Sequence, residues 1–181
     1  IMDTLPKIEL LSKYPVQPTI LFGHELPPFV KEYMDIQGLN YEIVATYHAK
    51  VEHLLVPTTR RRNGIPYPSA VKYLNNIPTD DMLVGTKLYV SRQKASSRRI
   101  VNEGEFMGKI LTEGVTMLHL DDCPVKYQKA LFHNAEKVIG PHGAGLANIV
   151  FSHNPIVLEL VTPAYTNPCC WLIGEIAGAD Y

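Results

Sequence analysis

Residues 137–151 read KVIGPHGAGLANIVF, and this stretch decides the fold class of the chain. The apolar run up to Gly140 is typical of a buried strand, and the segment from Leu146 onward is typical of a helix. Between them lies a turn that also contains Gly143 and Gly145. Unpaired amide N–H groups at the start of such a helix favour an anion. A strand that passes through a glycine-rich turn into a helix therefore predicts an α/β fold with a ligand near the turn.

The rest of the later half alternates between strands and helices. Short apolar runs predict the strands, and longer periodic runs predict the helices. The predicted strands are residues 87–92, 115–120, 137–140 and 156–160, and the predicted helices are 102–113, 125–134, one near Leu146, and 167–177. Helical crossovers of this length join parallel strands and cover both faces of a sheet. We therefore predict an α/β fold with a Rossmann-like, doubly wound parallel sheet of the nucleotide-binding type.

The earlier half carries a second α/β pattern. The predicted helices are residues 5–11, 28–36 and 68–75, and the predicted strands are 19–22, 41–46 and 53–56. The stretch TTRRRNGIPY, between Pro57 and Pro68, has no periodicity and predicts an exposed loop. Its arginines are either solvated or contact a phosphate or acceptor. A hydrophilic connector begins at Pro78, so we expect one lobe over residues 1–80 and a second lobe over residues 81–181.

Composition and charge exclude several functional classes. The chain is 46% hydrophobic and 19% charged, as in ordinary globular proteins. Lys and Arg total 17 against 18 for Asp and Glu, so no global field would attract nucleic acid or an anionic membrane, and any anion site must be local. The three cysteines, with Cys169 and Cys170 adjacent, match neither a disulfide framework nor the spacing of a zinc site, and they slightly favour a reducing compartment.

Targeting is left open by the sequence. No apolar run approaches the ~20 residues needed to cross a bilayer, and the first residues lack a basic segment followed by an apolar one. Both ends look cut, so we expect a fragment of a longer protein.

The glycine-rich turn is the first candidate ligand site. Ligands of open parallel sheets bind at the carboxyl ends of the strands, and glycine lets a phosphate approach the backbone. His142 could also donate a hydrogen bond to a diphosphate or to a sugar. The residues predicted here are His142, Gly143, Ala144 and Gly145. A purely structural tight turn is the alternative.

Two further strands end in charged or polar residues. The guanidinium fork of arginine matches phosphate oxygens, which favours a phosphate contact after strand 87–92. The residues predicted there are Ser91, Arg92, Arg98 and Asn102. A basic, solvated loop with Asn102 as a helix cap is the alternative. Glu159 ends strand 156–160, and it could accept hydrogen bonds from ribose hydroxyls or pair with a nearby arginine.

Three blocks in this order resemble glycosyltransferase family 61. They are LYVSRQKASSRRIVNE at 88–103, DDCPVKYQKALFHNAEKVIGPHGAGLANIVF at 121–151, and VLEL at 157–160. The family contains plant xylan and arabinosyl transferases, animal protein O-mannose GlcNAc transferases and bacterial capsule proteins. The likeness runs over about residues 87–181. Near the beginning, Asp3-Thr-Leu-Pro-Lys is similar to the end of a further family block, whose usual preceding His would lie upstream of Ile1.

The resemblance implies a two-lobed fold of the GT-B type and a nucleoside-diphosphate sugar, with a UDP-sugar expected, bound mainly by the later lobe. It implies inverting transfer to a glycan or glycoprotein hydroxyl, without a metal or other cofactor. The pairs Asp80-Asp81 and Asp121-Asp122 lack the Asp-x-Asp spacing of metal-dependent enzymes. Asp3 is the predicted base and His142 the second catalytic candidate. For Asp3, the alternative is a helix N-terminal residue favoured by the dipole.

Two other functions remain open. A nicotinamide-dependent dehydrogenase needs Gly-x-Gly-x-x-Gly and an acidic residue ~20 positions later. Glu159 falls 19 positions after Gly140, but Gly140, Gly143 and Gly145 have a different spacing. A non-catalytic module that binds sugar nucleotides or glycans would keep the same pocket without a base. The compartment would be cytoplasmic in a microbe, and the Golgi or endoplasmic reticulum lumen in a eukaryote.

Overall fold

The later half of the chain forms a four-stranded parallel sheet. We describe the protein from a computed structural model, which covers residues 5–11, 14–45, 48–58, 61–62, 65–77, 79 and 86–181. The strands are β5 (Thr86–Val90), β6 (Val115–Leu118), β7 (Ala135–Pro141) and β8 (Ile156–Leu160). Their order is β6-β5-β7-β8, and every neighbouring pair is parallel. The predicted α/β class with a parallel sheet is confirmed.

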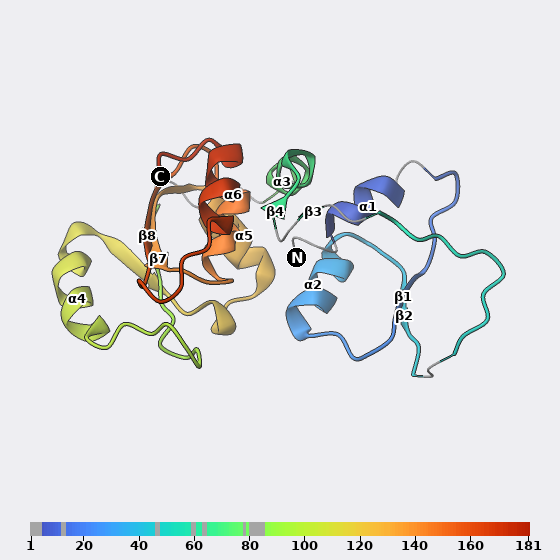
Figure 1. Cartoon of the computed structure of the whole chain (residues 1–181), viewed down its shortest axis with the longest axis horizontal. Helices are drawn as coiled ribbons and strands as arrows, with labels where there is room; N and C mark the ends of the chain where they lie inside the picture. Colours follow the sequence, from blue (N-terminus) through green and yellow to red (C-terminus); the bar gives the residue numbers. More distant parts are fainter. Residues whose placement is uncertain are drawn as a thin grey trace.

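Helices cover both faces of this sheet, because side chains of β5, β6 and β7 contribute to two separate apolar clusters. Leu88 and Val90 of β5 pack into the larger cluster, whereas Tyr89 packs into a smaller one with Met107. The larger cluster lies under α5 (Val125–His133), η3 (Leu146–Phe151) and α6 (Cys169–Ala177), and the smaller one lies under α4 (Glu103–Ile110). Figure 1 shows α4 on one side of the sheet and α5 and α6 on the other.

The earlier half forms a small α/β unit. Its elements are α1 (Leu5–Leu11), β1 (Ile20–Phe22), α2 (Pro28–Ile36), β2 (Tyr41–Ile43) and α3 (Pro68–Asn75). β1 and β2 pair in parallel, with Ile20 opposite Tyr41. Proline occupies the first turn of both α2 and α3, where its missing N–H costs nothing. After α2, Gly38 adopts a positive φ of 61°, as expected for a glycine that ends a helix.

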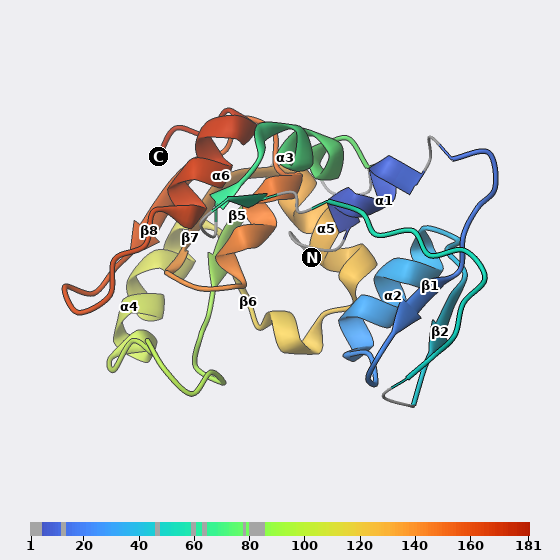
Figure 2. The same cartoon turned by 45° about the vertical axis from the view of Figure 1, so that its right-hand side comes forward.

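Helix α3 precedes the expected lobe boundary at residue 80, yet it packs against the later half. Ala70, Val71 and Leu74 are fully buried, and α3 contacts both α6 and η3. The Asn75 amide donates hydrogen bonds to the carbonyl oxygens of Val150 at 3.2 Å and of Ser152 at 2.6 Å. Figure 2 shows α3 beside α6, at the top of the molecule. One apolar cluster therefore runs from the earlier half into the later sheet.

Several predicted elements differ from the structure. Residues 53–56 form no strand, and Leu54 and Val56 are exposed. The loop predicted between residues 57 and 68 instead contains a short antiparallel pair, β3 (Arg61–Arg62) with β4 (Ile65–Pro66). The helix expected near Leu146 is the 3-10 helix η3, and two further single turns, η1 (Leu111–Glu113) and η2 (Leu120–Asp122), flank β6. Among the residues that the structure describes, no helix is long and apolar enough to span a bilayer.

Candidate functional site

The strand order reverses between β5 and β7. From β5 the chain moves outward to β6, and it then returns across the sheet to β7 and β8. Connections that leave neighbouring strands in opposite directions open a crevice at the carboxyl edge, which is where doubly wound sheets bind ligands. Ser91 and Arg92 directly follow β5, and His142 directly follows β7. The predicted turn and the predicted arginines thus lie on adjacent strands.

Arg92 lies directly against the glycine-rich turn. A Cβ atom added to Gly143 would lie 1.9 Å from Arg92 Nη1 and 2.7 Å from its Cζ. Nη2 donates to the carbonyl oxygen of Ser97 at 3.3 Å, whereas Nε is buried without a hydrogen-bond partner among the described residues. Burial lowers the pKa of Arg92, and the nearby positive charge of Arg98 lowers it further. A buried unpaired donor beside a second cation is a site that a bound anion would stabilise.

Arg98 joins the loop after β5 to the loop after β8. Its guanidinium carbon lies 4.8 Å from the centroid of the Tyr165 ring, and that ring lies 5.3 Å from the ring of His142. Arg98 has a positive φ of 55°, which is uncommon for a residue other than glycine. Strained backbone of this kind persists only where surrounding contacts hold it. Tyr165 was not predicted, and only its place in the loop after β8 could have signalled it.

His142 and Glu159 form a buried pair. His142 Nδ1 and Glu159 Oε1 are 2.6 Å apart, and their side chains are 5% and 8% exposed. Because the carboxylate can only accept, the Nδ1 proton is donated to it, which leaves His142 Nε2 available to a ligand. Glu159 Oε1 thus accepts from His142 Nδ1, and the contacts expected for Glu159 with a ribose or an arginine stay predictions.

Ser91 and Asn102 have internal roles in this structure. The Ser91 hydroxyl lies 2.9 Å and 3.0 Å from the two carboxylate oxygens of Glu103, and it accepts a hydrogen bond from the Gln93 amide at 3.1 Å. Asn102 stands at the N-terminal end of α4 without a side-chain capping bond, and its amide lies 3.4 Å from Glu105 Oε2. Ser91 and Asn102 thus each have a side-chain partner within the protein, and their contacts with a donor stay predictions.

The three glycines of the turn lie too close to neighbouring atoms to carry a side chain without a shift of those atoms. A Cβ at Gly140 would lie 3.1 Å from Val90 Cβ, and one at Gly145 would lie 2.9 Å from Leu120 Cδ1. None of the three turn glycines has a positive φ. Ala144 is the exposed residue of the turn. The close approach of β5 and of Leu120 therefore explains why positions 140 and 145 carry glycine. At position 143 a side chain would instead collide with Arg92, a predicted binding residue.

Asp3 falls outside the described residues, so its role as a base stays a prediction.

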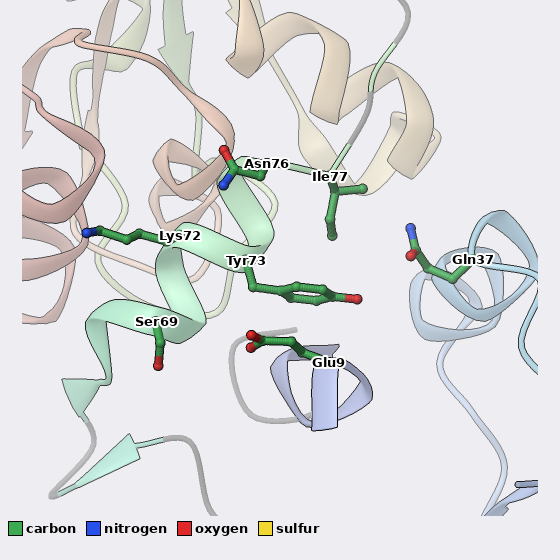
Figure 3. Close-up of a pocket in the computed structure, with 7 residues that line it drawn as sticks. All are labelled: Glu9, Gln37, Ser69, Lys72, Tyr73, Asn76 and Ile77. Atoms are coloured by element: carbon green, nitrogen blue, oxygen red, sulfur yellow. The ribbon is translucent and has the colours of Figure 1, made fainter. Parts of the chain in front are cut away.

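A cavity of about 440 Å³ is lined by Glu9, Gln37, Ser69, Lys72, Tyr73, Asn76 and Ile77. In Figure 3 the Tyr73 ring points between Glu9 and Gln37. Burial raises the pKa of Tyr73, and the charge of Glu9 adds to this shift. None of the predicted binding residues lines this cavity.

Comparison with known proteins identifies a family. The model of a family described as Glycosyltransferase 61 matches residues 1–158 of the 181. The matched range contains the expected lobe boundary, the two arginines and the whole glycine-rich turn, whereas Glu159 and α6 follow it. No curated protein matches the chain.

Proposed function

The chain belongs to the glycosyltransferase 61 family, and from this membership we propose that it transfers a sugar from a nucleoside-diphosphate donor, with a UDP-sugar expected, to a hydroxyl group of a glycan or protein. Glycosyltransferase activity follows from the family. The donor, the stereochemistry and the arrangement of two facing lobes of the GT-B type are our proposal. The nucleotide would lie on the later half, over the crevice between β5 and β7.

The observation that carries this proposal is the contact between Arg92 and Gly143. Arg92 Nε is buried and lacks a hydrogen-bond partner among the described residues, and a second cation, Arg98, lies close enough to lower the pKa of Arg92. An isolated buried donor costs about 1–3 kcal/mol, and a phosphate oxygen would remove this cost. The turn after β7 adds backbone N–H groups beside the guanidinium. These groups together favour a diphosphate.

The proposed reaction is a single displacement with inversion. The acceptor oxygen forms a bond to the anomeric carbon while the bond from that carbon to the diphosphate breaks, and the diphosphate departs with the electron pair. Arg92 and Arg98 would stabilise the negative charge that develops on the departing diphosphate. The acceptor proton would pass to a base, for which Asp3 stays the candidate.

We further propose that no Mg²⁺-like cation is needed on the diphosphate. Hard cations of this kind bind carboxylate oxygens, and Asp122, the second residue of an acidic pair near the site, is instead paired with Lys94. The hydrogen bond from Lys94 lowers the pKa of Asp122. The arginines supply the positive charge.

Calorimetric titration with uridine diphosphate, with and without added Mg²⁺, tests the donor site. We expect saturable binding that Mg²⁺ does not change, and at least a tenfold loss of affinity, ~1.4 kcal/mol, in Arg92→Gln. Arg99→Gln, which changes an exposed arginine of the same loop, is the matched control and should bind as the parent does. Equal affinity in Arg92→Gln and the parent would reject this site.

A further inference from the structure

A second group of reactive side chains lies under the glycine-rich turn. A ring nitrogen of His142 and the sulfur atoms of Cys169 and Cys170 all lie within 4.8 Å of one another. The two sulfur atoms are 4.0 Å apart, and Cys170 Sγ lies 4.0 Å from the carbonyl oxygen of Gly143. Both cysteines are free thiols at the start of α6, and neither has a role in the proposed transfer reaction.

The distances in this group suit a metal ion. Zinc binds thiolate sulfur at about 2.3 Å and imidazole nitrogen at about 2.0–2.1 Å, in a tetrahedral arrangement. Two such sulfurs would be about 3.8 Å apart by tetrahedral geometry, so the observed separation requires a shift of only a few tenths of an ångström. Tetrahedral geometry with these bond lengths puts nitrogen and sulfur about 3.6 Å apart. The ligand atoms lie within 4.8 Å of one another, so the imidazole and the thiols must approach each other by up to about 1.2 Å.

The surroundings of His142 resemble those of a metal-binding histidine. Such a histidine usually donates its second ring N–H to a carboxylate, which fixes the tautomer and the ring orientation. Here Nδ1 bonds to Glu159 at 2.6 Å, and both side chains are buried. The remaining nitrogen, Nε2, is then the one with a lone pair available.

We propose that His142, Cys169 and Cys170 form a binding site for a thiophilic divalent cation of the zinc class, with three protein ligands and a fourth position open to water. The sequence hides this site, since 27 positions separate His142 from Cys169 and adjacent cysteines match no zinc spacing. Burial raises the pKa of the Cys170 thiol, so the cation must displace a proton from it. The proposal concerns cation binding alone and does not depend on the donor site.

Titration of the reduced, metal-free protein with Cd²⁺ tests the site, because cadmium thiolates absorb in the ultraviolet. We expect one equivalent to bind with this absorption. Cys169→Ser and His142→Gln should each lower the affinity at least tenfold. Cys123→Ser is the matched control, since Cys123 is also a half-buried free thiol but lies outside the group, and it should bind as the parent does.

Each result decides the question. Absence of the absorption in the parent, or full affinity in either Cys169→Ser or His142→Gln, would overturn the site. Loss of binding in Cys123→Ser would overturn it as well, because the cation would then be held elsewhere. Circular dichroism of each variant checks that the fold is retained. Uridine diphosphate titration of the same samples shows separately whether the donor site is present.

Discussion

Gly143 illustrates how a single residue can link two strand ends. Its backbone lies under the guanidinium of Arg92, at a distance that leaves no room for a Cβ atom. The atoms that such a Cβ would meet belong to the far end of a long, flexible side chain. A larger residue at position 143 should therefore move Arg92 without unfolding the protein.

We predict that Gly143→Ala weakens uridine diphosphate binding about tenfold, ~1.4 kcal/mol, with the cooperative melting transition retained. The physical reason is displacement of the Arg92 guanidinium from the turn. Gly108→Ala is the control, because a Cβ at Gly108 in α4 meets nothing within 4 Å. This control should bind normally and gain about 0.5–1 kcal/mol of stability, since alanine is the better helix former. Calorimetry and thermal melting measure both effects, and normal binding by Gly143→Ala would contradict the prediction.

Glu103 connects two elements, strand β5 and helix α4. Its side chain is 2% exposed, and it accepts hydrogen bonds from the Tyr89 hydroxyl at 2.6 Å and from Ser91. Tyr89 is itself fully buried. This network fixes where the loop that carries Arg92 and Arg98 begins and ends, because Ser91 precedes the loop and Glu103 follows it.

We predict that Glu103→Ala strongly destabilises the protein. It would leave the fully buried Tyr89 hydroxyl without its acceptor, at about 1–3 kcal/mol for an unsatisfied buried group, and it would remove the acceptor of the half-buried Ser91 hydroxyl. Glu105→Ala, in the same turn of α4, removes an exposed carboxylate that pairs with Lys109 at 3.5 Å and accepts an exposed hydrogen bond from Asn102 at 3.4 Å, and it should change stability little. Urea unfolding of the two variants makes the comparison. Similar stabilities would show that the buried network does not hold the loop.

The elements that the sequence predicted well are those whose apolar pattern is strong. The four strands of the later sheet follow from runs such as IVLEL, and their common carboxyl edge brings together Arg92 and His142. Residues 53–56 have a similar apolar run, but a strand also requires a partner, which local pattern cannot supply. Tyr165 and the thiol of Cys170 reach His142 through long-range packing, and no local spacing marks such contacts.

The whole molecule should lose stability at high pH. Burial raises the pKa of Tyr33, Tyr89 and Tyr181 above the ordinary value of about 10, and the nearby carboxylates of Glu32, Glu103 and Glu159, respectively, contribute. The folded state therefore keeps these protons at a pH where the unfolded chain releases them. The free energy of unfolding should be constant with respect to these groups below pH 9 and should fall as the pH rises through 10.

Urea unfolding at a series of pH values between 8 and 11 measures this dependence. Tyr33→Phe removes one of the three groups and should make the decline less steep. A free energy of unfolding that rose with pH in this range would contradict the sign derived from the three buried tyrosines.

The continuity of the core across the expected lobe boundary leads to the last prediction. Leu74 of α3 is fully buried in the apolar cluster that also contains Val138 of β7 and Ile173 of α6. Truncating a buried leucine to alanine typically costs 2–5 kcal/mol, so Leu74→Ala should lower the free energy of unfolding by about that amount. Leu54→Ala is the control, because Leu54 is 67% exposed and its replacement should have little effect.

The number of transitions is as informative as the size of the change. Trp171 in α6 is the single tryptophan, so its fluorescence reports on the later half, whereas far-ultraviolet circular dichroism reports on the helices of both halves. If one core holds the described parts together, both probes should show one coincident transition, and Leu74→Ala should shift it as a whole. Two separate transitions would mean that the halves on either side of residue 80 unfold independently. In that case the packing of α3 against α6 would not couple them, and the contacts of Leu74 and Asn75 would stabilise only the later half.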